Sequence, residues 1–175
     1  MQVATAESTA SWTGFFRDLI ARGLTGVFLV TSDAHLGIQA AVGDCLPQAS
    51  WQRCRTHFAK NLSAQVPKTQ WPTLSAMFHT IFQQPDAASV WAQAREVIEF
   101  CQQKFPHVAT YLEECLDELL AFTAAPRAVW TKIWSNNPTE RLNREIRRRT
   151  DVRRNLPKPR RCCAPCWGGF GRTAR

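Results

Sequence analysis

Two features that would place the chain in or across a membrane are missing. No stretch of apolar residues approaches the roughly 20 that a membrane-spanning helix needs. The first residues also lack the basic segment and apolar run of a signal peptide. We therefore expect an intracellular, cytoplasmic protein without a membrane partner.

Several motifs that carry catalysis or hold small folds together are missing as well. The sequence has no Gly-rich phosphate loop, and no Ser/His/Asp or Cys/His set stands out for nucleophilic catalysis. Its seven cysteines are odd in number, and without a secretory signal they do not indicate a disulfide framework. Cys45, Cys101 and Cys115 fall at apolar-periodic positions, so we expect them to pack in the core.

Acidic residues are scarce in the last third of the chain. Residues 127–175 hold 14 of the 22 Lys and Arg but 3 of the 14 Asp and Glu, so the positive net charge arises there. Such a field favours a polyanionic partner, most simply nucleic acid. The alternative is a basic tail that is only solvated or disordered.

The length of 175 residues, 45% of them apolar, is enough for one globular domain with a real core. Apolar residues recur at helical spacing over most of it. The expected helices cover residues 9–22, with Gly23 as the stop, 38–46, the region around 58–62, and residues 71–82 and 90–101. The last expected helix begins near Pro106 and has its apolar stripe over 108–120, with the acidic residues 113, 114, 117 and 118 facing outwards. The stripes between residues 67 and 123 need one another for burial, so we expect a helical insertion there.

Strand signals are fewer. Residues 26–31 form a continuously apolar, β-rich run, typical of a strand buried on both faces of a parallel or mixed sheet. Residues 51–58 alternate in character and suggest a second, edge-like strand. Asp33 follows the first strand, where open α/β sheets place ligand chemistry, although Ser32 or Asp33 would serve equally well as the N-cap of the next helix.

Residues 136–151 combine an acidic start with an arginine-rich body. Asn137 is a good N-cap, Pro138 suits the first helical position, and Glu140 complements the helix dipole. Leu142 and Ile146, four residues apart, are expected to hold one face on the core. Locally, this pattern indicates a capped basic surface helix.

Two carboxylates have suggestive contexts, one after a buried strand and one opening a basic helix. If the fold brings Asp33 and Glu140 together, their oxygens suit Mg²⁺, and Arg144, Arg147 or Arg148 would contact phosphate. Such a site suits phosphoryl transfer on DNA.

Cys54 and His57 have zinc-compatible spacing, but tetrahedral zinc needs four ligands. The others would have to come from the cysteines of residues 162–166, in a tail without hydrophobic period, so zinc is not favoured. We expect instead a buried Cys54 and a hydrogen-bonded His57 near the Asp33 strand. His35 would touch substrate or cap a helix.

Three ordered segments carry a resemblance to a known family. They are SDAHLG (32–37), WQRCRTHF (51–58) and WSNNPTERLNREIRRR (134–149). In this order and at these separations, they resemble the C-terminal catalytic half of mutator-type bacterial insertion-sequence transposases. The resemblance runs from about residue 6 to residue 151.

The resemblance implies a ribonuclease H-like α/β fold with an all-helical insertion, and an Asp-Asp-Glu triad that binds Mg²⁺ or Mn²⁺. Asp33 matches the second aspartate, Glu140 the glutamate, and Cys54 with His57 the Cys-x2-His motif of the family. Glu145 competes with Glu140 for the role of the acid, but helix phase separates them by well over a right angle.

The segment after the glutamate is the expected DNA contact. Arg141 and Asn143 match the family residues that follow the glutamate. With the other arginines of this helix they make up the expected DNA-binding set: Arg141, Asn143, Arg144, Arg147, Arg148 and Arg149.

The family pattern is incomplete at both ends. Its first aspartate lies on a strand upstream of residue 1, and residues after 151 depart from it. We therefore expect residues 6–151 to form a truncated catalytic domain, with the helical insertion at 67–123, and residues 152–175 to be a disordered, frameshifted tail.

The expected function is DNA transposition, by metal-dependent cleavage and joining of DNA, with this chain inactive alone and associated with the nucleoid. The alternative is a non-catalytic, basic nucleic-acid-binding protein that regulates intact transposase. Its expected protein partners are intact transposase or further copies of this chain.

Overall fold

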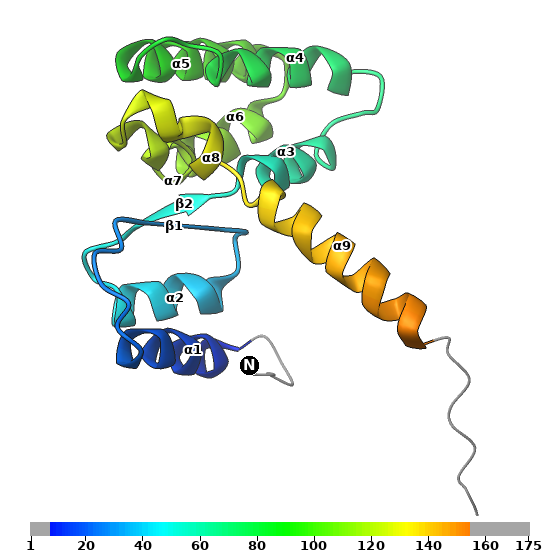
Figure 1. Ribbon diagram of the computed structural model, residues 1–175. Helices are drawn as coiled ribbons and strands as arrows, with labels where there is room; N and C mark the ends of the chain where they lie inside the picture. The colour runs from blue at the N-terminus through cyan, green and yellow to red at the C-terminus, as the bar shows by residue number, and fades with distance from the viewer. Residues whose placement is uncertain (1–7, 155–175) are drawn as a thin grey trace, which may run out of the picture. The chain divides into compact units, whose positions relative to one another are not determined.

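The computed structural model describes the backbone of residues 8–154 and the side chains of residues 8–149 (Figure 1). The chain divides into two compact units, residues 1–139 and residues 140–175, and each is described by itself. The expectations for the tail after Arg154, including the cysteines of residues 162–166, lie outside the described residues.

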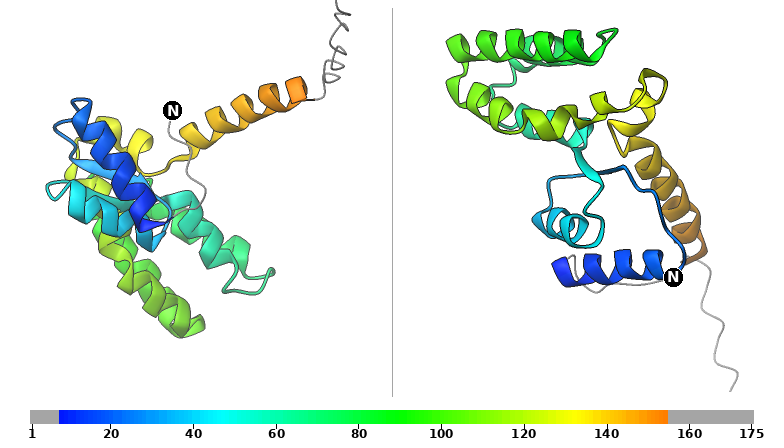
Figure 2. Two further views of the ribbon diagram at one scale, coloured as in Figure 1. Left: turned by 90° about the horizontal axis from the view of Figure 1, so that it is seen from below. Right: turned by 90° about the vertical axis from the view of Figure 1, so that its left-hand side faces the viewer.

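Two parallel strands, β1 (Leu29–Ser32) and β2 (Ser50–Arg53), form the sheet of the first unit among its described residues. Helix α2 (Leu36–Cys45) connects them, as a parallel pair requires a crossover. Leu29 pairs with Ser50 and Ser32 with Arg53, so the two strands end level. Helices α1 and α2 lie on one side of the strand pair and α3 to α8 on the other (Figures 1 and 2).

An α/β chain that is mostly helical by content was the sequence prediction, and the described residues agree with it. The ribonuclease H-like core and the helical insertion at 67–123 stay predictions.

Both strands are shorter than the sequence pattern indicates. The first begins at Leu29 rather than at residue 26, Phe28 is 82% exposed, and the side chains of residues 29–31 are only half-buried. The prediction of a strand buried on both faces is therefore wrong for the described residues, among which β1 pairs only with β2. The second strand ends at Arg53, because helix α3 (Arg55–Ser63) begins within the predicted strand.

The smaller of two cores lies between α1 (Thr9–Ala21) and α2. Phe16, Ile38, Ala41 and Val42 are its buried members. The stop after α1 is the predicted one: Gly23 has a φ of 98°, which glycine adopts without strain.

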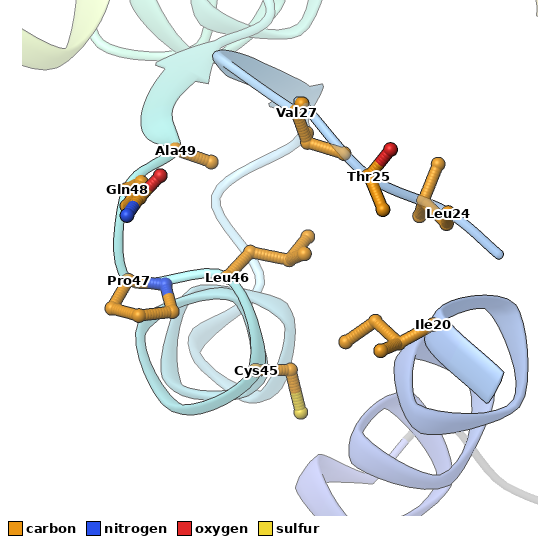
Figure 3. A pocket seen from close by; sticks show the side chains of 10 residues that line it. Ile20, Leu24, Thr25, Val27, Cys45, Leu46, Pro47, Gln48 and Ala49 are labelled. Carbon is orange, nitrogen blue, oxygen red and sulfur yellow. The ribbon is translucent and has the colours of Figure 1, made fainter.

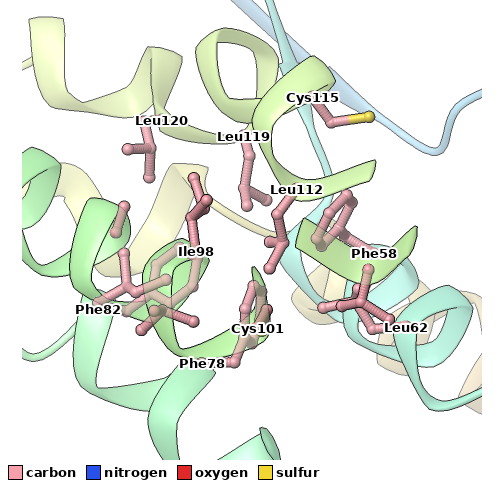
Figure 4. Packing of buried hydrophobic residues seen from close by; sticks show 14 of the residues in the cluster. Phe58, Leu62, Phe78, Phe82, Ile98, Cys101, Leu112, Cys115, Leu119 and Leu120 are labelled. Carbon is pink, nitrogen blue, oxygen red and sulfur yellow. The ribbon is translucent and has the colours of Figure 1, made fainter. Parts of the chain in front are cut away.

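The larger core lies on the side of the sheet that carries α3 to α8 (Figure 4). The elements on this side are α3, α4 (Trp71–Ile81), α5 (Ala87–Lys104), α6 (Pro106–Glu114), α7 (Leu116–Leu120), the 3-10 turns η1 (Ala121–Ala124) and η2 (Arg127–Val129), and α8 (Trp130–Ile133). Cys101 and Cys115 are buried here, as predicted, while Cys45 is only half-buried beside the smaller core.

The expected single helix over residues 108–120 is broken. It consists of α6 and α7, which meet at Cys115, where the backbone leaves helical geometry. The buried amide of Gln52 bonds the chain just beyond this break, because its Nε2 donates to the Leu119 carbonyl at 2.7 Å and its Oε1 accepts from Phe122 N–H at 2.7 Å. Glu118 was predicted to face outwards, but it is only partly exposed and its carboxylate lies 3.9 Å from the Arg53 guanidinium.

Helix α9 (Asn137–Arg154) carries the acid and the arginines. It begins one residue earlier than predicted, with Asn137 inside the helix rather than at the cap, and it continues past Asp151 into the predicted tail. Leu142 and Ile146 are 60% and 49% exposed on this helix, and their packing on the core stays a prediction. No helix in the described part of the chain is long and apolar enough to cross a membrane.

Candidate active site

The carboxyl ends of the two strands bring two of the sequence motifs together. Asp33 follows β1 and Cys54 follows β2, and the Cys54 N–H donates to the Ser32 carbonyl at 2.7 Å. Trp51 Nε1 donates to the Ser32 hydroxyl oxygen at 2.8 Å. This end of a parallel sheet is where α/β proteins place ligand chemistry.

Asp33 is exposed and does not cap the next helix. The N-cap of α2 is His35, whose Nδ1 accepts from Gly37 N–H at 3.2 Å. Of the two readings of this segment, the one with Ser32 or Asp33 as cap is therefore wrong, and the helix-capping role predicted for His35 is confirmed. The Asp33 carboxylate remains at the surface beside the strand ends.

A shallow depression surrounds Asp33. Its other side chains come from the end of β2, from α2's cap and from α3: His35, Arg53, His57, Lys60 and Asn61. One carboxylate thus lies among cationic, imidazole and amide groups. Such a mixture suits a phosphodiester, whose oxygens need cationic or N–H partners, beside an acid.

Arg53 is a buried residue that the motif comparison did not single out. Its Nη1 donates to Cys115 Sγ at 2.7 Å, and its Nη2 donates to the Tyr111 hydroxyl. The guanidinium also stacks on the Phe58 and Tyr111 rings, 4.9 and 5.2 Å from their centroids. The local sequence pattern does not predict that Arg53 is buried and hydrogen-bonded, because its partners lie about sixty residues further along the chain.

The first residues of the third motif contact the ends of the two strands. Cys54 Sγ donates to Asn136 Oδ1 at 2.9 Å, and Arg55 N–H donates to the Trp134 carbonyl at 2.9 Å. Thr31 Oγ1 on β1 donates to the Ile133 carbonyl at 2.6 Å. Segments 32–37, 51–58 and 134–137 therefore meet within the first unit, and the prediction of a buried Cys54 is confirmed.

The second unit carries Glu140 on α9. Glu140, Asn143, Arg144 and Arg147 line a shallow depression on this helix. All six predicted DNA-binding residues on this helix are exposed: Arg141, Asn143, Arg144, Arg147, Arg148 and Arg149.

Glu145, the competing acid, is held by neighbouring arginines. Its carboxylate accepts from Arg148 Nη2 at 2.8 Å and from Arg149 Nε at 2.8 Å. These bonds, first from Arg148 and then from Arg149, keep the pKa of Glu145 below its ordinary value. Its environment is that of a structural ion pair along the helix.

The donors at the strand ends fit a hard divalent cation in type. Asp33 offers exposed carboxylate oxygens, and Mg²⁺ is commonly held by one or two carboxylates with water and substrate phosphates completing its shell. The described residues contain no group of three or more His, Cys, Asp and Glu that could hold a metal by themselves. A metal at Asp33 would therefore need water, DNA or further acids as ligands.

A second pocket lies away from this chemistry (Figure 3). It sits between the end of α1 and the segments that lead into β1 and β2, and it is lined mainly by apolar side chains such as Ile20, Leu24 and Leu46. This is the amino end of the strands, and it holds none of the residues predicted for the site.

Comparison with known proteins defines the class. Residues 1–164 match the family described as "Transposase, Mutator family". The chain therefore belongs to the mutator family of transposases, as its three motifs indicate.

Particular relatives are insertion-sequence transposases. The chain is 58% identical to the transposase for insertion sequence element IS1081 of Mycobacterium tuberculosis, over 87% of this chain and 37% of the relative. It is 34% identical to the ISRM5 transposase of Rhizobium meliloti, over 93% of this chain and 41% of the relative. For the IS256 transposase of transposon Tn4001 from Staphylococcus aureus the identity is 32%, over 89% and 40%. The chain thus spans about two fifths of the length of these relatives.

Proposed function

We propose that this chain acts in DNA transposition, as part of a transposase catalytic domain with a ribonuclease H-like core. The observation that carries the proposal is the meeting of the three motifs beside the exposed Asp33, at the carboxyl ends of β1 and β2. The relatives, which are named as transposases of insertion sequences, support DNA as the substrate.

Asp33 and Glu140 are proposed as the carboxylates that hold Mg²⁺ or Mn²⁺. When bound, such an ion stabilises charge on the reacting phosphate and activates the attacking oxygen. Lys60, in the depression with Asp33, is proposed to contact a phosphate oxygen of the DNA. Arg144 and Arg147, in the depression with Glu140, are proposed to do the same along the backbone.

Metal binding tests this proposal without requiring catalysis. Mn²⁺ is titrated into the full chain with a DNA duplex, and free Mn²⁺ is measured by electron paramagnetic resonance. Because even second-shell changes weaken metal sites by about 10- to 100-fold, we expect Asp33→Asn and Glu140→Gln each to weaken binding at least about tenfold. If both hold one ion, the double variant will lose little more than either single variant.

Two exposed carboxylates provide controls. Asp44→Asn on α2 and Glu99→Gln on α5 each remove one acidic charge outside the proposed site. Both should bind Mn²⁺ within about twofold of the wild type, since a distant exposed charge is largely screened. Binding by Asp33→Asn or Glu140→Gln that matches these controls would refute the metal-binding role.

We also propose that the chain does not catalyse strand transfer by itself. The described residues hold no group of three potential metal ligands, while the family resemblance implies three carboxylates. Mg²⁺-dependent joining of a labelled donor end to target DNA by the purified chain, lost in Asp33→Ala and in Glu140→Ala, would contradict this.

A non-catalytic DNA-binding role is the second candidate. The exposed arginine-rich surface of α9 favours it. In that case the chain would bind DNA with a steep salt dependence and without any requirement for Mg²⁺. Equal DNA affinity with Mn²⁺ and with chelator would support this candidate over the metal site.

A further inference from the structure

We propose that Cys54 is a positioning residue that anchors the start of the acid-bearing helix α9. It acts in a hydrogen-bonded cluster, here called the Cys54 clamp, made of Cys54, Thr56, Ser135 and Asn136, of which Cys54 and Ser135 are buried. The significance of the clamp for Glu140 rests on the proposed function, whereas the clamp itself is tested independently of metal and DNA.

The clamp joins two segments about eighty residues apart. Cys54 Sγ donates to Asn136 Oδ1 at 2.9 Å and lies 3.6 Å from Ser135 Oγ. Ser135 Oγ is also 2.9 Å from Thr56 Oγ1, and it accepts from the N–H of Asn137, the first residue of α9, at 3.1 Å. The chain of hydrogen bonds thus ends on the first turn of α9.

The position of Cys54 shows that its thiol serves this contact and not its own helix. Cys54 is the N-cap of α3, a place where side chains commonly accept from the first N–H groups of the helix. Within the described part of the chain, the thiol forms no such capping bond. Its hydrogen bonds run instead to the segment that leads into α9.

Burial makes the clamp sensitive to a lost partner. Cys54 is fully buried and Ser135 nearly so, and a polar group in such surroundings loses more when its hydrogen bond is removed than it would in water. Removing the Cys54 thiol would leave the Asn136 side-chain carbonyl without the donor that it has in the clamp, and it would remove one of the three contacts of the Ser135 hydroxyl.

Residues on either side hold the clamp in place. The Arg55 guanidinium lies over the Trp134 ring at 4.6 Å and the Phe82 ring at 4.9 Å. Trp134 in turn packs edge-on against Phe82 and Phe122 of the larger core. The segment before α9 is therefore fixed to the same framework that carries the ends of β1 and β2.

For the proposed site, the clamp links the two acid-bearing segments through the chain. Cys54 follows the β2 end beside Ser32, one residue before Asp33, and Asn136 lies four residues before Glu140. The clamp thereby holds the first residue of α9, Asn137, three residues before Glu140. The Cys-x2-His motif would contribute position rather than a ligand.

Amide hydrogen exchange on the full ¹⁵N-labelled chain tests the clamp. Cys54→Ala should raise exchange at Asn137 and Arg141 about tenfold, because Asn137 N–H is bonded in the clamp and Arg141 N–H closes the first turn of α9. Cys54→Ser should remain within about twofold of the wild type, since its hydroxyl can donate to Asn136.

Cys101→Ala is the matched control. Cys101 is equally buried but lies on α5 in the larger core, where burial raises the pKa of its thiol to about 11. This variant creates a similar cavity without touching the clamp, so exchange at Asn137 and Arg141 should follow only the general change in stability. If Cys54→Ala does not fold, Asn136→Ala removes the same bond from the half-buried side and should raise the same two exchange rates.

The outcomes distinguish the clamp from a general loss of stability and from a metal site at Cys54. Equal exchange in Cys54→Ala and Cys101→Ala would overturn the proposal, as would failure of Cys54→Ser to restore protection. Protection that disappears on addition of a chelator would assign Cys54 to a metal instead. Because neither Mn²⁺ nor DNA is present, loss of the proposed metal site leaves this result unchanged.

Discussion

A single buried cation ties the candidate site to the helical region. Arg53 stands at the end of β2, lines the depression that holds Asp33, and bonds Tyr111 and Cys115 on the opposite side. Its planar guanidinium reaches two partners at once and stacks on two rings, which a lysine ammonium cannot do. The side chain therefore orders the floor of the depression rather than reaching substrate.

Replacing Arg53 with Met should lower the free energy of unfolding by about 2–4 kcal/mol. The estimate reflects hydrogen bonds from a charged group, worth about 1.5–3 kcal/mol each, and the buried cation–π contacts. Urea denaturation measures the change. Arg95→Met, at an exposed position on α5, should stay within about 0.5 kcal/mol of the wild type. Equal losses in the two variants, or full rescue by Arg53→Lys, would contradict this role.

At the scale of the element, α9 depends on ion pairs along its own surface. Glu145 accepts from Arg148 and Arg149, and these bonds depress its pKa. A carboxylate with a depressed pKa stabilises the helix above its ordinary pKa, and the contribution is lost as the pH falls through the depressed value. The helix should therefore be better formed at neutral pH than in acid.

The pH dependence of helicity checks this ion-pair network. At pH 7 the Glu145→Gln variant should show less helical ellipticity at 222 nm than the wild type. The difference should vanish as the pH falls well below about 4, the range where an ordinary glutamate protonates. Glu99→Gln, an exposed carboxylate on α5, is the matched comparison. A difference between wild type and Glu145→Gln that persists at pH 2.5 would rule out the charge as its cause.

Element boundaries were predictable where they depended on local chemistry. Helical spacing and Gly23 placed α1, and Pro106 marked the start of α6. The break at Cys115 was not predictable, because it occurs where Gln52 and Arg53 of a distant strand bond the chain. The apolar period continues across the break, so sequence alone indicated one helix.

For the whole molecule, the placement of charge bears on the proposed contact with DNA. The arginines of α9 differ in their surroundings: Arg148 is engaged by Glu145, whereas Arg144 lines the depression with Glu140 and Asn143. An arginine already paired with a carboxylate neutralises less phosphate charge. The two positions should therefore contribute unequally to binding.

A salt titration of duplex binding separates them. Arg144→Ala should reduce the magnitude of the slope of log K against log salt by about 1, the value for one lost phosphate contact. Arg148→Ala should reduce it by less. Fluorescence anisotropy with a labelled duplex measures both, and Arg95→Ala on α5 controls for net charge. Equal slopes for the wild type and Arg144→Ala would exclude Arg144 from the DNA contact.

Much of the candidate site was visible in the sequence. The three motifs indicated the family, Asp33 was placed after a strand, and Cys54 was expected to be buried, all of which the structure or the comparisons bear out. These features depend on residue type, spacing and periodicity, which the chain displays locally. The roles of Asp33 and Glu140 in metal binding stay predictions.

Only the tertiary structure decided which motif residues touch. Cys54 and Asn136 are 82 positions apart, and Arg53 finds Tyr111 58 positions away, yet each pair forms a hydrogen bond. It also decided that Phe28 is 82% exposed, although it lies in a continuously apolar run. The local pattern determines which residues are apolar, but whether anything covers them depends on the packing of distant segments.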